Sequence, residues 1–149
     1  MRHDIREIHL CPLYDKEAIL SVMDHHQDCF FDHDVDRKSL AEKISNNGHF
    51  VVALSNEETA GFVGFYANDS TGKTAFLSTI VVDQAYQGLG IGRLLVQECL
   101  KVSTERGMKK CRLEVDKRNQ RAIRFYERLG FARINEASKQ TDFYEYTWQ

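Results

Sequence analysis

Hydrophobic positions recur along this chain with two different periods, which predicts a mixture of strands and helices. Residues 3–10 alternate between apolar and polar side chains, as in a strand. Residues 14–28 carry apolar side chains at helical spacing, and a second short helix is predicted around Leu40 and Ile44. Gly48, after two asparagines, is a natural end for that second helix.

Three strands are predicted in the middle of the chain. The apolar runs 50–54 and 60–66 flank a polar turn, which favours a hairpin. Residues 76–82 form the most apolar stretch of the sequence and end in β-branched side chains. This pattern is typical of a central strand that is covered on both faces.

A glycine-rich turn at 87–92 leads from that strand directly into another predicted helix. Gly107 is the natural C-terminal stop of this helix. Residues 109–116 then alternate between apolar and charged side chains, which predicts a further strand.

The last part of the chain predicts one helix and a closing pair of strands. Asn119 is a good N-cap for the helix, Gly130 ends it, and the strands cover 131 onward and 143–148. The predicted fold class is α/β with a mixed central sheet, in the order β-α-α-β-β-β-α-β-α-β-β. With no linker or internal repeat in the sequence, residues 1–149 are expected to form a single domain.

Composition narrows the possible functions. Twenty Lys and Arg against 22 Asp and Glu give a net charge of −2, which argues against a dedicated nucleic-acid binder. The 42% hydrophobic content excludes a disordered chain, and no apolar run is long enough to cross a membrane. The widely spaced cysteines suggest neither a disulfide framework nor a zinc ribbon; they are Cys11, Cys29, Cys99 and Cys111. Without a visible targeting segment, the expected location is cytoplasmic.

The glycine turn has the features of an anion site, because the free N–H groups and the dipole of a helix N-terminus favour negative charge. Nucleotide-binding motifs also place a glycine-rich turn at a helix N-terminus, but their glycines are spaced differently. A dinucleotide fingerprint starting at Gly88 would need glycine in place of Arg93, and a Walker loop fails at the same position. The alternative is a turn that only connects a strand to a helix.

Two sequence signatures resemble those of the GNAT N-acetyltransferase superfamily. The run 82–93 contains Q-G-L-G-I-G, similar to the family pattern [QR]-x-x-G-x-[GA] after a central strand. The run 113–131 is similar to L-x-V-x-x-x-N-x-x-A-[IR]-x-[FL]-Y-x-x-x-G-F. One departure is Gln84, where proline is frequent in the family.

This resemblance implies acetyl-CoA as co-substrate. Its pantetheine arm is expected along the end of the central strand and near the helix cap Asn119, with its pyrophosphate over the N–H groups of 87–93. The expected cofactor-binding residues are Ile80, Val81, Val82, Gln87, Gly88, Leu89, Gly90, Ile91, Gly92, Arg93, Asn119 and Ala122.

Tyr126 matches the tyrosine that faces the cofactor sulfur in this family. A phenol with a pKa near ~10 is a weaker acid than a thiol near ~8.5, so full proton transfer to the thiolate is not downhill. The hydroxyl can still stabilise the developing thiolate as a general acid. The alternative is that Tyr126 only packs in the core. A backbone N–H near Val81 or Val82 is expected to polarise the thioester carbonyl.

Glu114 is the candidate general base for the acceptor amine, which is mostly protonated near neutral pH. Its spacing from Tyr126 is similar to that of the family branch that acetylates ribosomal-protein N-termini. The alternative is a solvated glutamate paired with Arg112 or a lysine. The position used by histone-acetylating relatives falls near Thr74, which cannot act as a base, so a histone-type mechanism is not expected.

Charge is distributed unevenly. Residues 14–36 carry −6 and residues 93–133 carry +7, which fits a cationic amine on one side and an anionic cofactor on the other. On a continuous helix His25, Cys29 and His33 would share one face, but no metal is expected there. Five aromatic residues are candidates for either the acceptor pocket or the core: Phe30, Phe31, Tyr144, Tyr146 and Trp148.

The sequence therefore predicts an acetyl-CoA-dependent N-acetyltransferase that works by direct attack in a ternary complex. The expected acceptor is a small amine such as an amino sugar or polyamine, with no nucleic acid, membrane or metal involved; a homodimer is left open. Two alternatives remain. One is an enzyme that acetylates a protein N-terminus or lysine, and the other is a non-catalytic acyl-CoA-binding sensor module.

Overall fold

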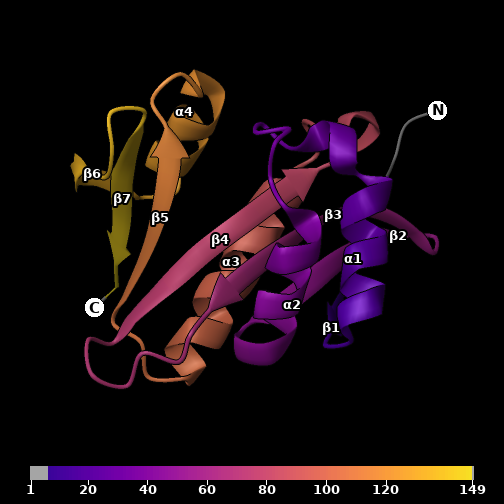
Figure 1. Ribbon diagram of the computed structural model, residues 1–149, viewed down its shortest axis with the longest axis horizontal. Coiled ribbons are helices and arrows are strands. Elements are labelled where there is room, and N and C mark those ends of the chain that lie inside the picture. Colours follow the sequence, from indigo (N-terminus) through magenta and orange to yellow (C-terminus); the bar gives the residue numbers. More distant parts are fainter. Residues whose placement is uncertain (1–6, 149) are drawn as a thin grey trace.

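A seven-stranded mixed sheet forms the centre of the computed structural model, which describes residues 7–148 (Figure 1). In chain order the elements are β1 (Ile8–Leu13), α1 (Lys16–His25), η2 (Gln27–Cys29), α2 (Arg37–Asn47), β2 (His49–Ser55), β3 (Glu58–Tyr66), β4 (Thr74–Val82), η3 (Gln84–Tyr86), α3 (Ile91–Glu105), β5 (Lys110–Asp116), α4 (Gln120–Arg128), β6 (Ala132–Glu136) and β7 (Thr141–Thr147).

The order of strands and α-helices expected from the sequence is confirmed. The structure adds two short 3-10 helices, η2 and η3. The first strand begins at Ile8, and residues 3–6 of the predicted strand lie outside the described residues. The first helix ends at His25, three residues earlier than its apolar spacing predicts.

The strands lie in the order β1-β2-β3-β4-β5-β7-β6, and β4 and β5 are the one parallel pair among the described strands. Their register covers only Thr74 to Phe76 against Lys110 to Arg112. Beyond these residues the two strands diverge, as Figure 1 shows. Among the described strands, none therefore pairs with the β5-facing edge of β4 from Leu77 onward.

A β-bulge lies where β4 leaves β5. On β3, Gly64 pairs with Thr79 and Phe65 pairs with Leu77, so Ser78 is left over. As a result Leu77 and Ile80 both contact the same core, although they are three residues apart and would point to opposite faces of a regular strand. An extra residue bends a strand and increases its twist, which is consistent with the divergence seen here.

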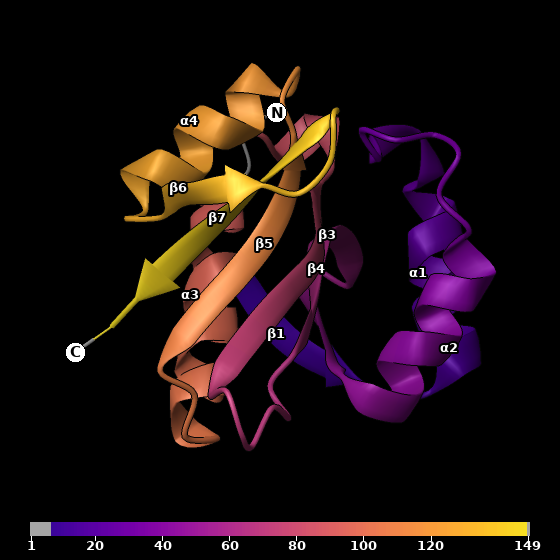
Figure 2. The ribbon, with the colours of Figure 1, turned by 60° about the vertical axis from the view of Figure 1, so that its left-hand side comes forward.

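Two hydrophobic cores cover the two faces of the sheet. In Figure 2 α1 and α2 lie on one side of the sheet and α3 and α4 on the other. Ile19, Met23 and Ile44 from α1 and α2 are fully buried against Phe50 and Phe62 of β2 and β3. The second core joins α3 and α4 to the opposite face. Within residues 7–148, no helix has the length and apolar character needed to cross a bilayer.

Candidate functional site

The glycine turn leaves the N-terminus of α3 open. Gly88 and Gly90 have φ of 81° and 84°, which side chains with a Cβ rarely adopt, and Gly90 is the N-cap residue. Aspartate or asparagine side chains cap α1, α2 and α4, but no side chain among the described residues caps α3. The first N–H groups of this helix are therefore available to an anion.

A cavity of about 610 Å³ opens over this turn, and we call it the glycine-turn cavity. The cofactor-binding residues expected from the sequence all line it except Leu89, whose side chain packs on the core. The full lining is Cys29, Phe31, Ile80, Val81, Val82, Tyr86, Gln87, Gly88, Gly90, Ile91, Gly92, Arg93, Asn119, Arg121, Ala122, Phe125, Tyr126 and Arg128.

Two arginines of this cavity were not expected from the sequence. Arg121 and Arg128 are seven residues apart on α4, so they lie on one face of the helix, and that spacing was the available signal. Neither of them, nor Arg93, forms an ion pair within the described part of the chain, whereas Arg112 and Arg133 bind Glu145 and Asp142. The cavity thus holds positive charge that no carboxylate of residues 7–148 neutralises.

The cap of α4 joins this helix to the cavity. The side-chain oxygen of Asn119 accepts a hydrogen bond from the Ala122 N–H at 3.2 Å, as its predicted capping role requires. Three residues after Ala122, Phe125 packs against Gly92 of α3 so closely that an added Cβ would lie 3.1 Å from its ring. A glycine at 92 therefore sets the distance between the two helices.

Tyr126 is almost fully buried on the inner face of α4, between Phe125 and Phe131 at ring centroid distances of 5.3 and 5.7 Å. Its side chain also lines the glycine-turn cavity. Burial raises the pKa of Tyr126 well above the ordinary value for a phenol, with a further contribution from Cys111 and Cys99. Its hydroxyl has no hydrogen-bond partner among the described residues and remains available to a ligand.

A second cavity of about 670 Å³ lies on the other side of the diverging strands, and we call it the acidic groove. The two cavities meet between β4 and β5, because six residues line both: Phe31, Ile80, Val81, Asn119, Ala122 and Tyr126. The rest of the lining of the acidic groove is Phe30, Asp32, His33, Asp34, Val35, Leu40, Phe76, Leu77, Ser78, Thr79, Leu113, Glu114, Val115, Asp116, Arg118 and Thr141.

Glu114 is exposed in this groove, on the face of β5 opposite to the buried Leu113 and Val115. Its carboxylate accepts a hydrogen bond of 2.6 Å from the Thr141 hydroxyl of β7. The alternative pairing with Arg112 is not formed, because Arg112 binds Glu145 at 2.9 Å. The structure therefore brings Glu114 and Tyr126 to one groove, from opposite faces of the sheet.

Three of the seven acidic residues between 14 and 36 stabilise the local fold. Asp15 and Asp36 cap α1 and α2, and Asp24 binds Arg37 at 2.7 Å. Asp32 and Asp34 line the groove. From β5, Asp116 also lines it, but hydrogen bonds from Arg118 lower the pKa of Asp116 to about 2 and hold it as an ion pair.

The aromatic candidates separate into two groups. Phe30 and Phe31 line the groove. Tyr144, Tyr146 and Trp148 belong to the core on the other face, where Tyr146 packs against Phe131 at 5.5 Å. The reason is strand parity: Tyr144 and Tyr146 lie opposite the inward-facing Leu113 and Cys111 in the register of β5 and β7.

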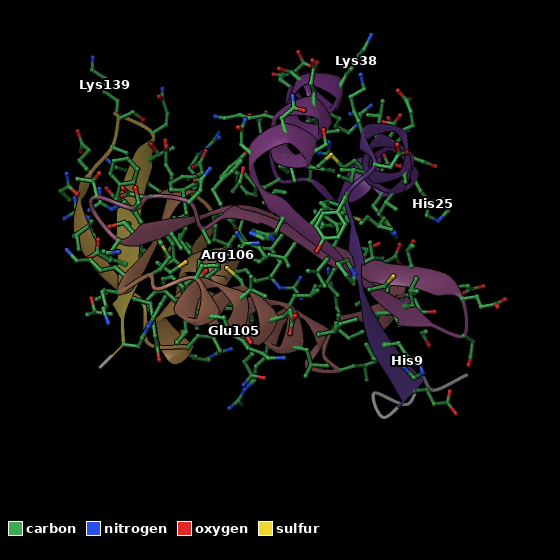
Figure 3. All side chains as sticks on the ribbon, turned by 90° about the horizontal axis from the view of Figure 1, so that it is seen from below. His9, His25, Lys38, Glu105, Arg106 and Lys139 are labelled. Carbon is green, nitrogen blue, oxygen red and sulfur yellow. The ribbon has the colours of Figure 1, made fainter. Side chains whose placement is uncertain are left out.

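The histidines do not form the helical row that their spacing allows. Because α1 ends at His25, a continuous helix through Cys29 and His33 does not exist. His25 points outward (Figure 3), whereas His26 is 1% exposed and lies between Asp83, at 3.1 Å from its Nδ1, and Thr59, at 2.6 Å from its Nε2. Burial lowers the pKa of His26.

Comparison with known proteins gives a family and several relatives. Residues 9–131 match the family described as "Acetyltransferase (GNAT) family". The chain is 36% identical over 84 residues to N-alpha-acetyltransferase 30 of Schizosaccharomyces pombe, covering 55% of this chain and 56% of that protein. It is 32% identical over 103 residues to the [Ribosomal protein bS18]-alanine N-acetyltransferase of Escherichia coli, covering 69% and 68% of the two chains.

A solved structure supports the fold independently. The PaiA N-acetyltransferase of Thermoplasma acidophilum, solved in complex with coenzyme A, superposes with a TM-score of 0.77 at 18% identity, covering 95% of this chain and 99% of that one. At this identity the similarity concerns the fold alone. The match to the fission-yeast relative spans little more than half of that protein's length.

Proposed function

We propose, from the premise that this chain belongs to the GNAT acetyltransferase family, that it transfers the acetyl group of acetyl-CoA to a primary amine. The observation that carries the proposal is the junction of two cavities of opposite character between β4 and β5. One contains an uncapped helix N-terminus and unpaired arginines, and the other contains carboxylates.

The glycine-turn cavity has the chemistry that coenzyme A requires. A pyrophosphate is bound by free N–H groups at a helix start and by arginines, which both fit phosphate oxygens. The N-terminus of α3 and the side chains of Arg93, Arg121 and Arg128 supply these donors. The strand edge of β4 beyond Phe76 offers backbone groups to the amide-containing pantetheine arm.

In the proposed reaction the amine nitrogen attacks the thioester carbonyl carbon and the C–S bond breaks. The Tyr126 hydroxyl hydrogen-bonds to the leaving sulfur and stabilises the developing thiolate; its proton passes to the sulfur as the hydroxyl regains a proton from the attacking nitrogen, which loses its second proton when the amide forms. Its raised pKa keeps Tyr126 protonated before the reaction, so it acts as a donor and never as a resting phenolate. A backbone N–H at Val81 or Val82 stabilises the negative charge that develops on the carbonyl oxygen.

Glu114 is proposed to accept a proton from the incoming ammonium group, directly or through water. Since a protonated amine has no lone pair for attack, this step must come first. The Thr141 hydroxyl holds the Glu114 carboxylate in a fixed orientation within the groove. A carboxylate that is exposed and unpaired with a cation remains free to receive this proton.

We propose a small cationic amine, of the amino sugar or polyamine class, as the acceptor. Asp32, Asp34 and Glu114 give the groove a negative lining, which attracts a protonated amine. Phe30 and Phe31 add an apolar wall against which the carbon skeleton of such a molecule can pack.

A second acceptor class is favoured by a specific observation. The fission-yeast relative is named an N-alpha-acetyltransferase, and the Escherichia coli relative is named for an alanine of ribosomal protein bS18. The acidic groove runs along β4 and β5 and has room for the first residues of a peptide. A free protein N-terminus is therefore the second candidate acceptor.

The test is release of coenzyme A thiol from acetyl-CoA in the presence of two panels, one of small amines and one of short peptides with free N-termini. Turnover with a small amine supports the first acceptor class, and turnover with peptides alone supports the second. If calorimetry shows that acetyl-CoA binds but neither panel gives turnover, the protein is a non-catalytic sensor module and not an enzyme. No binding at millimolar acetyl-CoA would overturn the proposal.

A further inference from the structure

A cluster of three metal-ligating side chains lies beside the two cavities and has no role in the proposed reaction. His26, Cys29 and Asp83 place one imidazole nitrogen, one thiol sulfur and one carboxylate oxygen within 4.8 Å of one another. Asp83, directly after β4, is 57 residues from His26 in the sequence. We propose that these three residues bind a Zn²⁺ ion.

The type of donor selects the metal. Nitrogen and sulfur ligands with a single carboxylate suit Zn²⁺, while Mg²⁺ and Ca²⁺ take oxygen ligands. Three protein ligands leave the fourth tetrahedral position to water, and two neighbouring cavities reach the cluster. Cys29 lines the glycine-turn cavity, and Asp83 lines a separate cavity of about 580 Å³ between α1 and the β2–β3 turn.

The surroundings of the cluster match those of zinc ligands. Metal-bound histidines usually form a hydrogen bond through their second ring nitrogen, which fixes the ring orientation. Here Nδ1 of His26 faces Asp83, while Nε2 lies 2.6 Å from the Thr59 hydroxyl. A hydroxyl can donate or accept, so Thr59 satisfies the ring both in the metal-free and in the zinc-bound tautomer.

Two further contacts hold the other ligands. The second carboxylate oxygen of Asp83 accepts from the Ala85 N–H at 2.9 Å, and the Gln84 N–H points to the sulfur of Cys29. The ring of Phe62 packs beside His26 at a centroid distance of 6.1 Å and shields the cluster from the core side. All three ligand side chains are therefore positioned by residues that do not themselves bind metal.

Zinc binding has a defined proton balance. The imidazole of His26 is neutral before and after, and its proton moves from Nδ1 to Nε2 as Nδ1 binds the metal. The Cys29 thiol becomes a thiolate, so one proton leaves for each zinc bound. The ion would tie the C-terminal end of α1 and η2 to the end of β4, where the glycine turn begins.

The test is calorimetric titration of metal-free full-length protein with ZnCl₂ in two buffers of different ionisation enthalpy. We expect one zinc per chain and release of about one proton. Cys29→Ser and Asp83→Asn should each weaken binding by at least about tenfold, and Thr59→Val, which removes the partner of Nε2, by roughly 10- to 100-fold. Cobalt should give a thiolate-to-metal absorption band that Cys29→Ser lacks.

Two controls make the test specific. Cys11→Ser removes a partly buried thiol from β1, and His25→Gln removes the outward-facing neighbour of His26; both should bind zinc as the wild type does. Circular dichroism verifies that each variant is folded. Absence of stoichiometric zinc binding, or binding that Cys29→Ser leaves unchanged, overturns the proposal. These measurements need no acetyl-CoA, so they are independent of the proposed acetyl transfer.

Discussion

Two regions of this chain carry opposite charge, but they use their charges differently. In the acidic region, residues 14–36, Asp15, Asp24 and Asp36 cap helices or bind an arginine. In the basic region, residues 93–133, Arg112, Arg118 and Arg133 have carboxylate partners. Of the other cations in this region, Arg93, Arg121 and Arg128 line one cavity, around the open end of α3.

This difference shows that the net charge of a segment is a weak guide to its ligand, because much of that charge stabilises the fold. The charges that matter are those left without a partner. For the basic region these form a concentrated anion site. In the acidic region, Asp32 and Asp34 share the groove with Glu114 of β5, whereas Glu17 and Asp28 line neither cavity.

The largest effect is expected where the two regions meet. Tyr126→Phe removes the only polar atom of a side chain that lines both cavities, and it should lower kcat by about 100-fold or more while changing the KM for acetyl-CoA little. Steady-state kinetics with saturating amine checks this. Tyr144→Phe, in the core and outside both cavities, is the matched control and should retain wild-type kcat. Equal rates for Tyr126→Phe and wild type would remove Tyr126 from the mechanism.

On the acidic side, Glu114→Gln should lower the rate by roughly tenfold near pH 7. The loss should shrink near pH 9, where more of an alkyl amine with a pKa of ~10.4 is already deprotonated and needs no base. A pH–rate profile measures this difference. Glu105→Gln, at the far end of α3, serves as the control. If Glu114→Gln lowers the rate by the same factor at every pH, Glu114 contributes to substrate binding and not to proton removal.

On the basic side, the double substitution of Arg121 and Arg128 by alanine should raise the KM for acetyl-CoA by on the order of tenfold, because each guanidinium can bind a phosphate oxygen. Arg124→Ala changes an arginine of the same helix that does not line the cavity, so KM should be unaffected. Acetyl-pantetheine, which lacks the phosphates of the nucleotide, should be insensitive to both changes. If its KM rises equally, the arginines do not contact phosphate.

The glycine turn allows a matched pair of substitutions. Gly88 and Gly107 have φ of 81° and 83°, and an added Cβ at either meets no atom within 4 Å. Alanine at either position should lower the free energy of unfolding by about 1 kcal/mol through backbone strain. Only Gly88→Ala should also raise the KM for acetyl-CoA, by a few fold, since it lies at the cavity. If Gly88→Ala and Gly107→Ala change the KM for acetyl-CoA equally, the glycine turn has no specific role in cofactor binding.

The smallest effect concerns stability and pH in the metal-free protein. Burial lowers the pKa of His26 below 6.5, although the nearby Asp83 acts to raise it. Burial also lowers the pKa of His49. The unfolded chain then binds more protons than the folded chain, so this stability is complete above pH 6.5 and is lost as the pH falls toward the lowered pKa values. Thermal melts from pH 7.5 to 5 should show the decline, and His26→Gln should flatten it. An equally steep decline in that variant would contradict this assignment.

Local sequence determined much of the fold. The helix caps Asn119 and Gly130, the glycine turn and the alternation in β5 each depend on near neighbours in the chain, and the order of elements followed from them. The resemblance of two short motifs to those of the GNAT family predicted most residues of the glycine-turn cavity. It also led to Tyr126 and Glu114 as candidates, which the structure brings to one groove from opposite faces of the sheet.

Other features required the tertiary structure, because they depend on contacts between distant segments. Sequence periodicity extended α1 past His25 and aligned Cys29 with His33, but the helix ends there and His26 turns toward Asp83, 57 residues away. The bulge at Ser78 and the divergence of β4 from β5 result from strand pairing, and hydrophobic alternation does not encode pairing. The sequence by itself determined which elements form and in which order. Only the tertiary structure decided which charges keep a partner and which remain free for a ligand, since a partner can come from any part of the chain.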